Sequence, residues 1–454
     1  MSLHVLTIET PSLGDRSYLA HDGEVAVVID PQRDIDRVLT LAEQHGVRIT
    51  DVFETHIHND YVTGGYALAQ QVGARYHVNA DDPVSFDRTP IREGDVVWAS
   101  AELSVRAMAT PGHTFTHLSY VLESPAGAVA VFSGGSMLFG ASGRPDLLGD
   151  AHKDELVRHQ YASLRRLAEE LPDATEVMPT HGFGSFCSAG STGGTTASTI
   201  GQEKRANPAL TEAEEQWIAQ TLASLDAFPA YYAHMGPANS AGPTAPPLTP
   251  PALADRDTIA RSVRAGEWVV DLRNRQAFAA GHVVGTLNFG GDDLQFSTYL
   301  GWLIPWGTPL TLLGESPAQV AKAQRELVRI GIDGLAGAAV GAPSDWTEGA
   351  LGSFERASFA DLEHVRRHRP VTILDVRQRS EFADSHIDGA VNIPINEVLS
   401  RLGDLPAGEV WVHCAAGYRA SIVASVLAAN GIAVVAVDDD YGVNAARCGL
   451  PLSA

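Results

Sequence analysis

The stretch Glu54–Gly65, "ETHIHNDYVTGG", brings several metal-binding residue types close together. His56, His58 and Asp60 stand at alternate positions, and Tyr61 follows where another histidine would complete the set. Imidazole and carboxylate groups are common ligands of zinc and iron. The stretch therefore predicts a metal-site loop, and residues far from it in the sequence decide whether the site is complete.

Residues 1–232 surround this loop with an α/β pattern, in which strand-like runs such as "EVAVVID" alternate with helix-like stretches such as "DELVRHQYASLRRLAEEL". Three further motifs occur there: His113 in "TPGHTFTHLSY", the turn "FSGGSMLFGASGRPDL", and His181 in "MPTHGFGSFC". Together with T-H-x-H-x-D, these motifs resemble the metallo-β-lactamase fold, in particular persulfide dioxygenases and glyoxalase II-like hydrolases. The resemblance implies an αββα sandwich over residues 1–232.

The resemblance also implies a metal site. Persulfide dioxygenases of this family hold one iron with the first histidine of H-x-H-x-D-H, the histidine of the P-G-H turn and the aspartate of the G-D turn. These positions are His56, His113 and Gly135 here, so the aspartate ligand is replaced by glycine. Tyr61 replaces the histidine of a second metal site, which argues against a binuclear zinc hydrolase. Changing Gly135 to Asp is expected to restore the carboxylate and to raise iron binding.

Two interpretations of the histidines remain open. His56, His58 and His113 form a three-histidine face suited to one iron or zinc ion, or they hydrogen-bond to one another, to Asp60 and to Tyr61 in a polar pocket without metal. The cofactor prediction is therefore either none or one Fe or Zn ion in the N-terminal domain.

Other residues near these motifs have two interpretations each. Arg144 and Asp146 in "GRPDL" either orient an anionic thiol or form an internal salt bridge. Cys187 either lines the pocket or is a buried inert thiol, and the second interpretation is favoured.

The second half of the chain begins with a linker and then repeats itself. The stretch "GPANSAGPTAPPLTPPA" is rich in Pro and Gly, which predicts a linker over residues 233–254. Beyond it, "VVDLRNRQAFAAGHVVGTLNF" is matched 104 positions later by "ILDVRQRSEFADSHIDGAVNI", as Asp271 is by Asp375. A constant offset marks a duplicated unit. Two α/β domains with parallel sheets are therefore expected, over residues 255–345 and 355–454.

The second copy contains the strongest chemical signal of the chain. Cys414 lies between the strand-like run "EVWVHC" and the helix-like stretch "ASIVASVLAANGI". A cysteine at a strand-to-helix turn lies among free backbone N–H groups at the positive end of a helix dipole, which favours the thiolate. Cys414 is therefore the predicted nucleophile and Arg419 the predicted partner of an anionic substrate. The intervening residues predicted to bind substrate are Ala415, Ala416, Gly417 and Tyr418.

The pattern C-x-x-G-x-R after D-V-R and "HIDGAVNIP" resembles the rhodanese family of sulfurtransferases. The resemblance implies that Cys414 stores a sulfane sulfur as a persulfide and passes it to a thiol or cyanide. In the first copy, Gly314 stands where Cys414 stands in the second, so that copy resembles inactive rhodanese-like domains. The aromatic insert "YLGWLIPWG" of the first copy is expected to be packing surface.

Composition limits the partners. The formal net charge of the 454 residues is −23, which disfavours nucleic acid and anionic membrane surfaces. No apolar run approaches the ~18 residues of a membrane span. With three scattered cysteines, the chain is expected to be cytoplasmic. The expected partners are small-molecule thiols, persulfides or thiosulfate, and a homo-oligomer is left open.

Three functional hypotheses follow. The leading one is a sulfane-sulfur transferase that uses Cys414, beside a metal-poor metallo-β-lactamase-like domain, in sulfide and persulfide metabolism. The first alternative is a persulfide dioxygenase with an atypical mononuclear iron site fused to a rhodanese. The second alternative is a non-enzymatic persulfide-binding scaffold.

Overall fold

The structure, a computed structural model, describes residues 3–190, 194–246 and 248–454. It divides into two compact units, residues 1–247 with 328–331 and residues 248–327 with 332–454. Residue 247, in the expected linker, lies outside the described residues. Within the described part of the chain, every helix is too short or too polar to cross a membrane.

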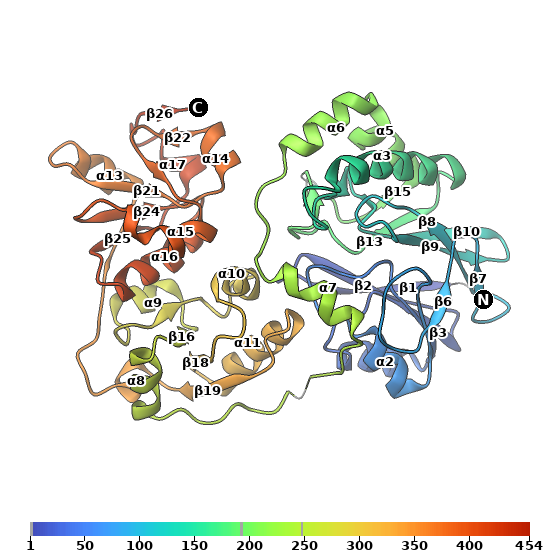
Figure 1. Cartoon of the computed structure of the whole chain (residues 1–454), viewed down its shortest axis with the longest axis horizontal. Helices are drawn as coiled ribbons and strands as arrows, with labels where there is room; N and C mark the ends of the chain where they lie inside the picture. The colour runs from blue at the N-terminus through green and yellow to red at the C-terminus, as the bar shows by residue number, and fades with distance from the viewer. Residues whose placement is uncertain (1–2, 191–193, 247) are drawn as a thin grey trace. The chain divides into compact units, whose positions relative to one another are not determined.

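The first unit contains two sheets that pack face to face (Figure 1). One sheet consists of β1 (His4–Thr10), β2 (Asp15–His21), β3 (Val25–Ile29), β4 (Arg48–Phe53), β5 (Arg75–Asn79) and β6 (Thr89–Ile91), in that order. The other has the order β15 (Ser198–Thr199), β13 (Glu176–Pro179), β10 (Gly127–Gly134), β9 (Leu118–Ser124), β8 (Ser104–Ala109) and β7 (Val96–Trp98). A small third sheet consists of β11 (Met137–Leu138), β12 (Ala141–Gly143) and β14 (Ser188–Ala189).

Helices cover the outer face of each sheet. The first sheet is covered by α1 (Asp36–His45) and α2 (Gly65–Val72). The second is covered by α3 (Lys153–Glu170), α4 (Ile200–Ala206), α5 (Pro208–Thr211) and α6 (Glu214–Ala223). On α3, Val157, Tyr161 and Leu164 recur at helical spacing and are all buried, which attaches this face to the sheet. The expected αββα sandwich is confirmed.

The stretch predicted to be linker is partly helical. Helix α7 (Tyr232–Ser240) occupies its first residues, although Pro237 lies inside the helix. Asn239 is buried, and its side chain donates hydrogen bonds to the carbonyls of His58 and Tyr61, both at 2.8 Å. The helix therefore belongs to the first unit, where it supports the loop that carries the histidines.

The second unit begins with a four-stranded parallel sheet. Its strands have the order β17 (Leu287–Asn288), β16 (Trp268–Asp271), β18 (Leu310–Gly314) and β19 (Leu335–Val340). Its helices are α8 (Arg256–Arg264), α9 (Arg275–Ala280), α10 (Phe296–Leu303), α11 (Pro317–Arg329) and α12 (Pro343–Trp346).

A five-stranded parallel sheet follows. Its strands have the order β20 (Glu355–Ala357), β25 (Val434–Val437), β24 (Val410–His413), β21 (Thr372–Asp375) and β23 (Val391–Asn392). Strands β22 (His386–Ile387) and β26 (Leu452–Ser453) form a separate pair. The helices are α13 (Phe359–Arg366), α14 (Arg379–Asp384), α15 (Val398–Arg401), α16 (Tyr418–Ala429) and α17 (Tyr441–Asn444), with short 3-10 turns η1 (Ile395–Glu397) and η2 (Leu402–Asp404).

The same hydrogen bonds recur in both sheets of the second unit. Arg273 pairs with Asp271 at 2.7 Å, and Arg377 pairs with Asp375 at 2.6 Å. The side chain of Asn288 donates to the carbonyls of Asp271 and Arg273, as the side chain of Asn392 donates to those of Asp375 and Arg377. The repeat in the sequence is therefore also a repeat in structure, with the shared strand order β17-β16-β18-β19 and β23-β21-β24-β25.

Candidate functional site

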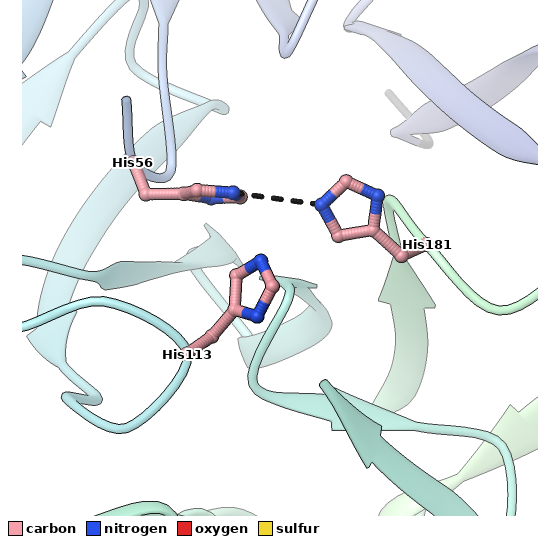
Figure 2. Close-up of side chains that lie close together, drawn as sticks. All are labelled: His56, His113 and His181. Atoms are coloured by element: carbon pink, nitrogen blue, oxygen red, sulfur yellow. Dashed lines mark hydrogen bonds between the residues drawn. The ribbon is translucent and has the colours of Figure 1, made fainter. Parts of the chain in front are cut away.

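Three histidines of the first unit meet from separate loops at the ends of strands. His56 follows β4, His113 lies between β8 and β9, and His181 follows β13. One ring nitrogen of each lies within 4.8 Å of the other two, and all three side chains are buried. Figure 2 shows the three rings facing a common centre, with His56 and His181 joined at 3.5 Å between their Nε2 atoms.

The outward-facing nitrogen of each ring is already bound. His113 Nδ1 lies 2.9 Å from the carbonyl oxygen of Arg144, and His181 Nδ1 lies 2.9 Å from a carboxylate oxygen of Asp15. His56 Nδ1 lies 2.9 Å from the hydroxyl of Thr55. Hydrogen bonds of this kind orient imidazole rings around metal ions.

His58, predicted to join His56 and His113, lies in a neighbouring polar cluster. Its Nε2 is 3.0 Å from the hydroxyl of Tyr61 and 3.2 Å from carboxylate oxygens of Asp30 and of Glu54. Burial opposes its charged form, but these two carboxylates raise the pKa of His58 to about 9. The structure thus groups His56 and His113 with His181, whereas His58 falls into two other groups of possible ligands: His58 with Asp60 and His181, and His58 with Asp30 and Glu54.

Burial and neighbouring charges give the three central histidines different pKa values. Burial lowers the pKa of His113 to about 3 and holds that of His56 well below its usual range. Burial has the same effect on His181, but Asp60 and Asp15 outweigh it and hold the pKa of His181 well above its usual range. The pocket thus combines two imidazoles that stay neutral with one that carboxylates favour as a cation.

Gly135, where the family has its aspartate, packs directly against His113. A Cβ atom at this position would lie 2.2 Å from Cδ2 of the His113 ring, and one at Gly143 would lie 2.8 Å from its Nδ1. The expectation that Gly135→Asp restores the missing carboxylate stays a prediction, and it requires the His113 ring to move away from position 135. The residues present do not fit the two-histidine, one-aspartate iron site of the family.

Two other residues that the sequence singled out in the first unit, Arg144 and Cys187, contact neighbouring side chains of the same unit. Arg144 pairs with Asp146 at 2.7 Å, which agrees with the internal salt bridge rather than with a thiol-binding role. Cys187 is buried, its thiol lies 3.8 Å from the hydroxyl of Tyr232, and burial holds its pKa well above the usual range. This surrounding favours an inert thiol.

The Cys414 loop lies where strand β24 ends and helix α16 begins. Cys414 is buried, and the backbone N–H of Gly417 donates a hydrogen bond to its sulfur at 3.2 Å. Gly417 has a φ of 88° and a Cβ there would lie 2.2 Å from Asp438, so only glycine fits this position. The sulfur therefore faces a backbone donor at the N-terminus of α16, the positive end of the helix dipole.

The side chains around the loop come from the same fold. Arg419 makes a bidentate ion pair with Glu381 on α14, at 2.6 and 2.8 Å. Ala415 and Ala416 are the more open part of the loop, with Ala416 exposed. The guanidinium expected to hold an anionic donor is thus already paired with a carboxylate, which orients it and offsets its charge.

The first copy contributes to the surroundings of this loop. Arg275 pairs with Asp438 at 2.9 Å, and Asp438 also binds Arg356 of the second copy. Tyr299 on α10 packs against the ring of Tyr418, with centroids 5.8 Å apart. The insert that was expected to be packing surface therefore packs beside the Cys414 loop.

The corresponding turn of the first copy is built differently. Asp271 is opposite Leu313 in the sheet as Asp375 is opposite His413, so Gly314 corresponds to Cys414. Two residues separate Gly314 from the start of α11 at Pro317. In the second copy, three residues separate Cys414 from the start of α16 at Tyr418, so the loop of the first copy is one residue shorter. The side chain of Gln319 accepts a hydrogen bond from the N–H of Glu315 at 2.8 Å and donates one to the carbonyl of Leu272 at 3.0 Å.

Three residues near these sites were not assigned by the sequence. His181 was noted only as part of a motif, although its place at the end of a strand is the same signal that marks His56. Glu381 lies in the helix that follows D-V-R, so an acidic residue there was the available signal for a partner of Arg419. For Asn239 the Pro-rich composition gave no signal.

Comparisons with known proteins agree with both halves of this architecture. The model of the Rhodanese-like domain family matches residues 359–442. A hydroxyacylglutathione hydrolase from Fuscovulum blasticum is 33% identical over 192 residues, which are 40% of this chain and 68% of that protein. The hydroxyacylglutathione hydrolase from Polaromonas sp. is 32% identical over 160 residues, and the match covers 35% of this chain and 57% of that protein's length, less than two thirds.

A solved structure also supports the fold. The metallo-beta-lactamase from Staphylococcus aureus subsp. aureus COL is similar with a TM-score of 0.67 and 27% identity, over 75% of this chain and 99% of that chain. ETHE1 from Myxococcus xanthus is 29% identical with a TM-score of 0.45, over 52% of this chain and 98% of that chain. The chain belongs to the hydroxyacylglutathione hydrolase family of metallo-β-lactamase-fold proteins, and it carries a rhodanese-like domain at residues 359–442.

Proposed function

We propose that the protein is a sulfane-sulfur transferase that forms a persulfide on Cys414. The Cys414 thiolate attacks the outer sulfur of a donor such as thiosulfate. A bond forms between Sγ and that sulfur, the sulfur–sulfur bond of the donor breaks, and sulfite leaves with the bonding electrons. A thiolate or cyanide then attacks the outer sulfur of the persulfide, and Cys414 leaves as the thiolate.

The observation that carries the proposal is the hydrogen bond from the Gly417 N–H to the sulfur of Cys414, at 3.2 Å at the start of α16. A backbone donor at a helix N-terminus stabilises negative charge on the thiolate. Arg419 is the second residue of α16, two positions after Gly417, and its guanidinium suits an anionic donor. The match to the rhodanese-like domain family supports sulfur chemistry for this part of the chain.

For the first unit, a role in sulfur metabolism is supported by its relatives alone. We propose that this unit binds a thiol or a persulfide, the same classes of compound that react with Cys414. A persulfide dioxygenase is less well supported. The aspartate of that site is Gly135, and the ring of His113 fills the space beside it. A non-enzymatic scaffold would not need the hydrogen bond that the N–H of Gly417 donates to the sulfur of Cys414.

The proposal is tested with Cys414→Ser in the full chain. The variant is expected to lose thiosulfate-to-cyanide sulfur transfer, measured as thiocyanate, and the persulfide adduct on its peptide in the mass spectrum. Cys448→Ser, which changes a partly exposed thiol outside the loop, serves as the matched control and should keep both signals. Thiocyanate production by Cys414→Ser at the wild-type rate would exclude the proposal.

A further inference from the structure

We propose that Arg275 of the first copy is a positioning residue for the Cys414 loop of the second copy. Its guanidinium holds the peptide group whose N–H faces the sulfur of Cys414. The proposal rests on the proposed function of Cys414, and it adds a residue that lies outside the rhodanese-like domain at residues 359–442.

One peptide group links Ala416 to Gly417. A trans peptide is planar, and its carbonyl oxygen and its N–H point in opposite directions. The N–H of Gly417 donates a hydrogen bond to Sγ of Cys414 at 3.2 Å. On the opposite side, Nη2 of Arg275 lies 3.5 Å from the carbonyl oxygen of Ala416. A group that holds this oxygen therefore also sets the direction of the N–H at the sulfur.

The guanidinium of Arg275 acts through its charge as well as through its position. The 3.5 Å between Nη2 and the oxygen of Ala416 is long for a hydrogen bond. Electrostatic attraction falls off slowly with distance, so the cation still attracts the carbonyl oxygen. Hydrogen-bonding groups in a chain polarise one another, and a cation at the oxygen makes the N–H a stronger donor. Negative charge on Sγ is therefore better stabilised when Arg275 is in place.

Asp438 keeps the guanidinium of Arg275 beside the loop. Nε of Arg275 donates to one carboxylate oxygen at 2.9 Å, and Arg356 of the second copy binds the other oxygen. The first oxygen also lies against the backbone of Gly417, since a Cβ there would be 2.2 Å from it. The glycine thus allows the carboxylate to approach closely enough to place Arg275 beside the loop.

The two copies are joined close to this contact. The backbone N–H of Asn288 in the first copy donates to the hydroxyl of Ser425 on α16 at 2.9 Å, and both residues are buried. Arg275 is the first residue of α9 and follows the N-cap residue Asn274, whose side chain accepts a hydrogen bond from the N–H of Ala277. The backbone that carries Arg275 is therefore fixed relative to α16.

The repeat supplies an internal comparison. Arg379 stands 104 positions after Arg275, at the equivalent place in the second copy. Its guanidinium pairs with Glu397 instead, at 2.6 and 2.8 Å. The surroundings of Arg275, and not the residue type alone, direct its side chain to the loop. Arg379 is therefore the matched control.

The experiment measures how fast iodoacetamide alkylates Cys414 in the full chain. The product is followed by mass spectrometry of the Cys414 peptide, with the partly exposed Cys448 as the internal reference. Iodoacetamide is uncharged and its reaction requires no sulfur transfer, so the rate reports on the sulfur itself. We expect Arg275→Gln to lower the rate about 10-fold, the order of one charge-assisted hydrogen bond, and Arg379→Gln to react as the wild type does. Equal rates in Arg275→Gln and the wild type would overturn the proposal.

Persulfide formation from thiosulfate separates positioning from donor binding. A positioning role predicts that Arg275→Gln lowers the single-turnover rate constant at saturating thiosulfate and leaves the half-saturating concentration unchanged. An unchanged rate constant with weaker binding would place Arg275 in the donor site and contradict the proposal. A wild type that forms no persulfide would exclude the proposed function, whereas the alkylation rates would still decide the role of Arg275.

Two further variants separate contact with the loop from support by Asp438. Arg356→Gln removes the other partner of Asp438 and should slow alkylation less than Arg275→Gln does. Equal slowing would mean that the carboxylate, and not the contact with Ala416, positions the loop.

Arg275→Lys keeps the charge but replaces two nitrogens with one. It should react more slowly than the wild type and faster than Arg275→Gln. This variant decides the matter if Arg275→Gln does not fold, since a rate equal to that of the wild type would then contradict the proposal.

Discussion

Glu381 forms an ion pair with Arg419, the residue predicted to bind the sulfur donor. The bidentate pair holds the guanidinium in place but offsets its charge. We expect Glu381→Gln to lower the KM for thiosulfate a few-fold, roughly the scale of a partly exposed ion pair, with little change in kcat. Arg419→Ala should raise that KM. Steady-state kinetics of the two variants measures both, and a raised KM in Glu381→Gln would mean that orientation outweighs charge.

Gly135 is the residue on which the position of His113 depends. A methyl group there would take the place of the ring, since a Cβ would lie 2.2 Å from its Cδ2. Gly135→Ala is therefore expected to lower the free energy of unfolding by about 1–3 kcal/mol, because the buried His113 ring must move. Thermal unfolding measures the loss. Gly236→Ala, where the nearest atom to a Cβ is 3.4 Å away, is the matched control and should unfold as the wild type does.

At the scale of elements, α10 of the first copy is expected to influence the sulfur donor bound at the second. Burial raises the pKa of Tyr299 to about 12, while Arg419 lowers it and Cys414 raises it, which indicates electrostatic coupling of its phenol to both groups. Tyr299→Phe keeps the ring and removes the hydroxyl. We expect a KM for thiosulfate raised ~2- to 10-fold, the effect of one hydrogen bond. Trp306→Phe, on the exposed end of the same insert, should leave kinetics unchanged.

Elements were predictable from the sequence where the signal was local. The strand before Cys414 and the helix after it follow from an apolar run and a helical stretch, and the repeat follows from a constant offset. Helix α7 was not predictable, because Gly236 and Pro237 oppose a helix. Tertiary contacts stabilise it, among them the burial of Tyr232 and Met235 and the hydrogen bonds of Asn239. The pairing of Arg419 with Glu381 joins residues on different helices, which composition and spacing alone leave undetermined.

At the scale of the whole molecule, the histidine cluster lies in the first compact unit and Cys414 in the second. We therefore expect His181→Gln to keep full thiosulfate-to-cyanide activity. Thiocyanate formation is measured on this variant and on the wild type. Loss of transfer activity in a folded His181→Gln protein would show that the histidine pocket takes part in the chemistry of Cys414.

The metallo-β-lactamase and rhodanese architectures could be predicted because their motifs lie at strand ends in a fixed order along the chain. The membership of the histidine cluster could not. His56 and His58 are equivalent in the sequence pattern, and only the three-dimensional positions of Asp30, Tyr61 and Thr55 decide which of them faces His113. His181 enters the cluster for the same reason, since its ring is turned by Asp15 from another strand.

The turn after Gly314 leaves little room for a cysteine in the first copy. A cysteine at position 314 would have its Cβ 3.0 Å from Val320 and 3.2 Å from Gln319. It would also find the nearest backbone N–H already bound by that glutamine, in a loop one residue too short to surround a sulfur atom. A loop like that of Cys414 would need a substitution at Gly314, an insertion of one residue and the removal of Gln319 together. We therefore expect Gly314→Cys to produce no persulfide at position 314, with the contribution of the first copy confined to the contacts that Arg275 and Tyr299 make beside the Cys414 loop.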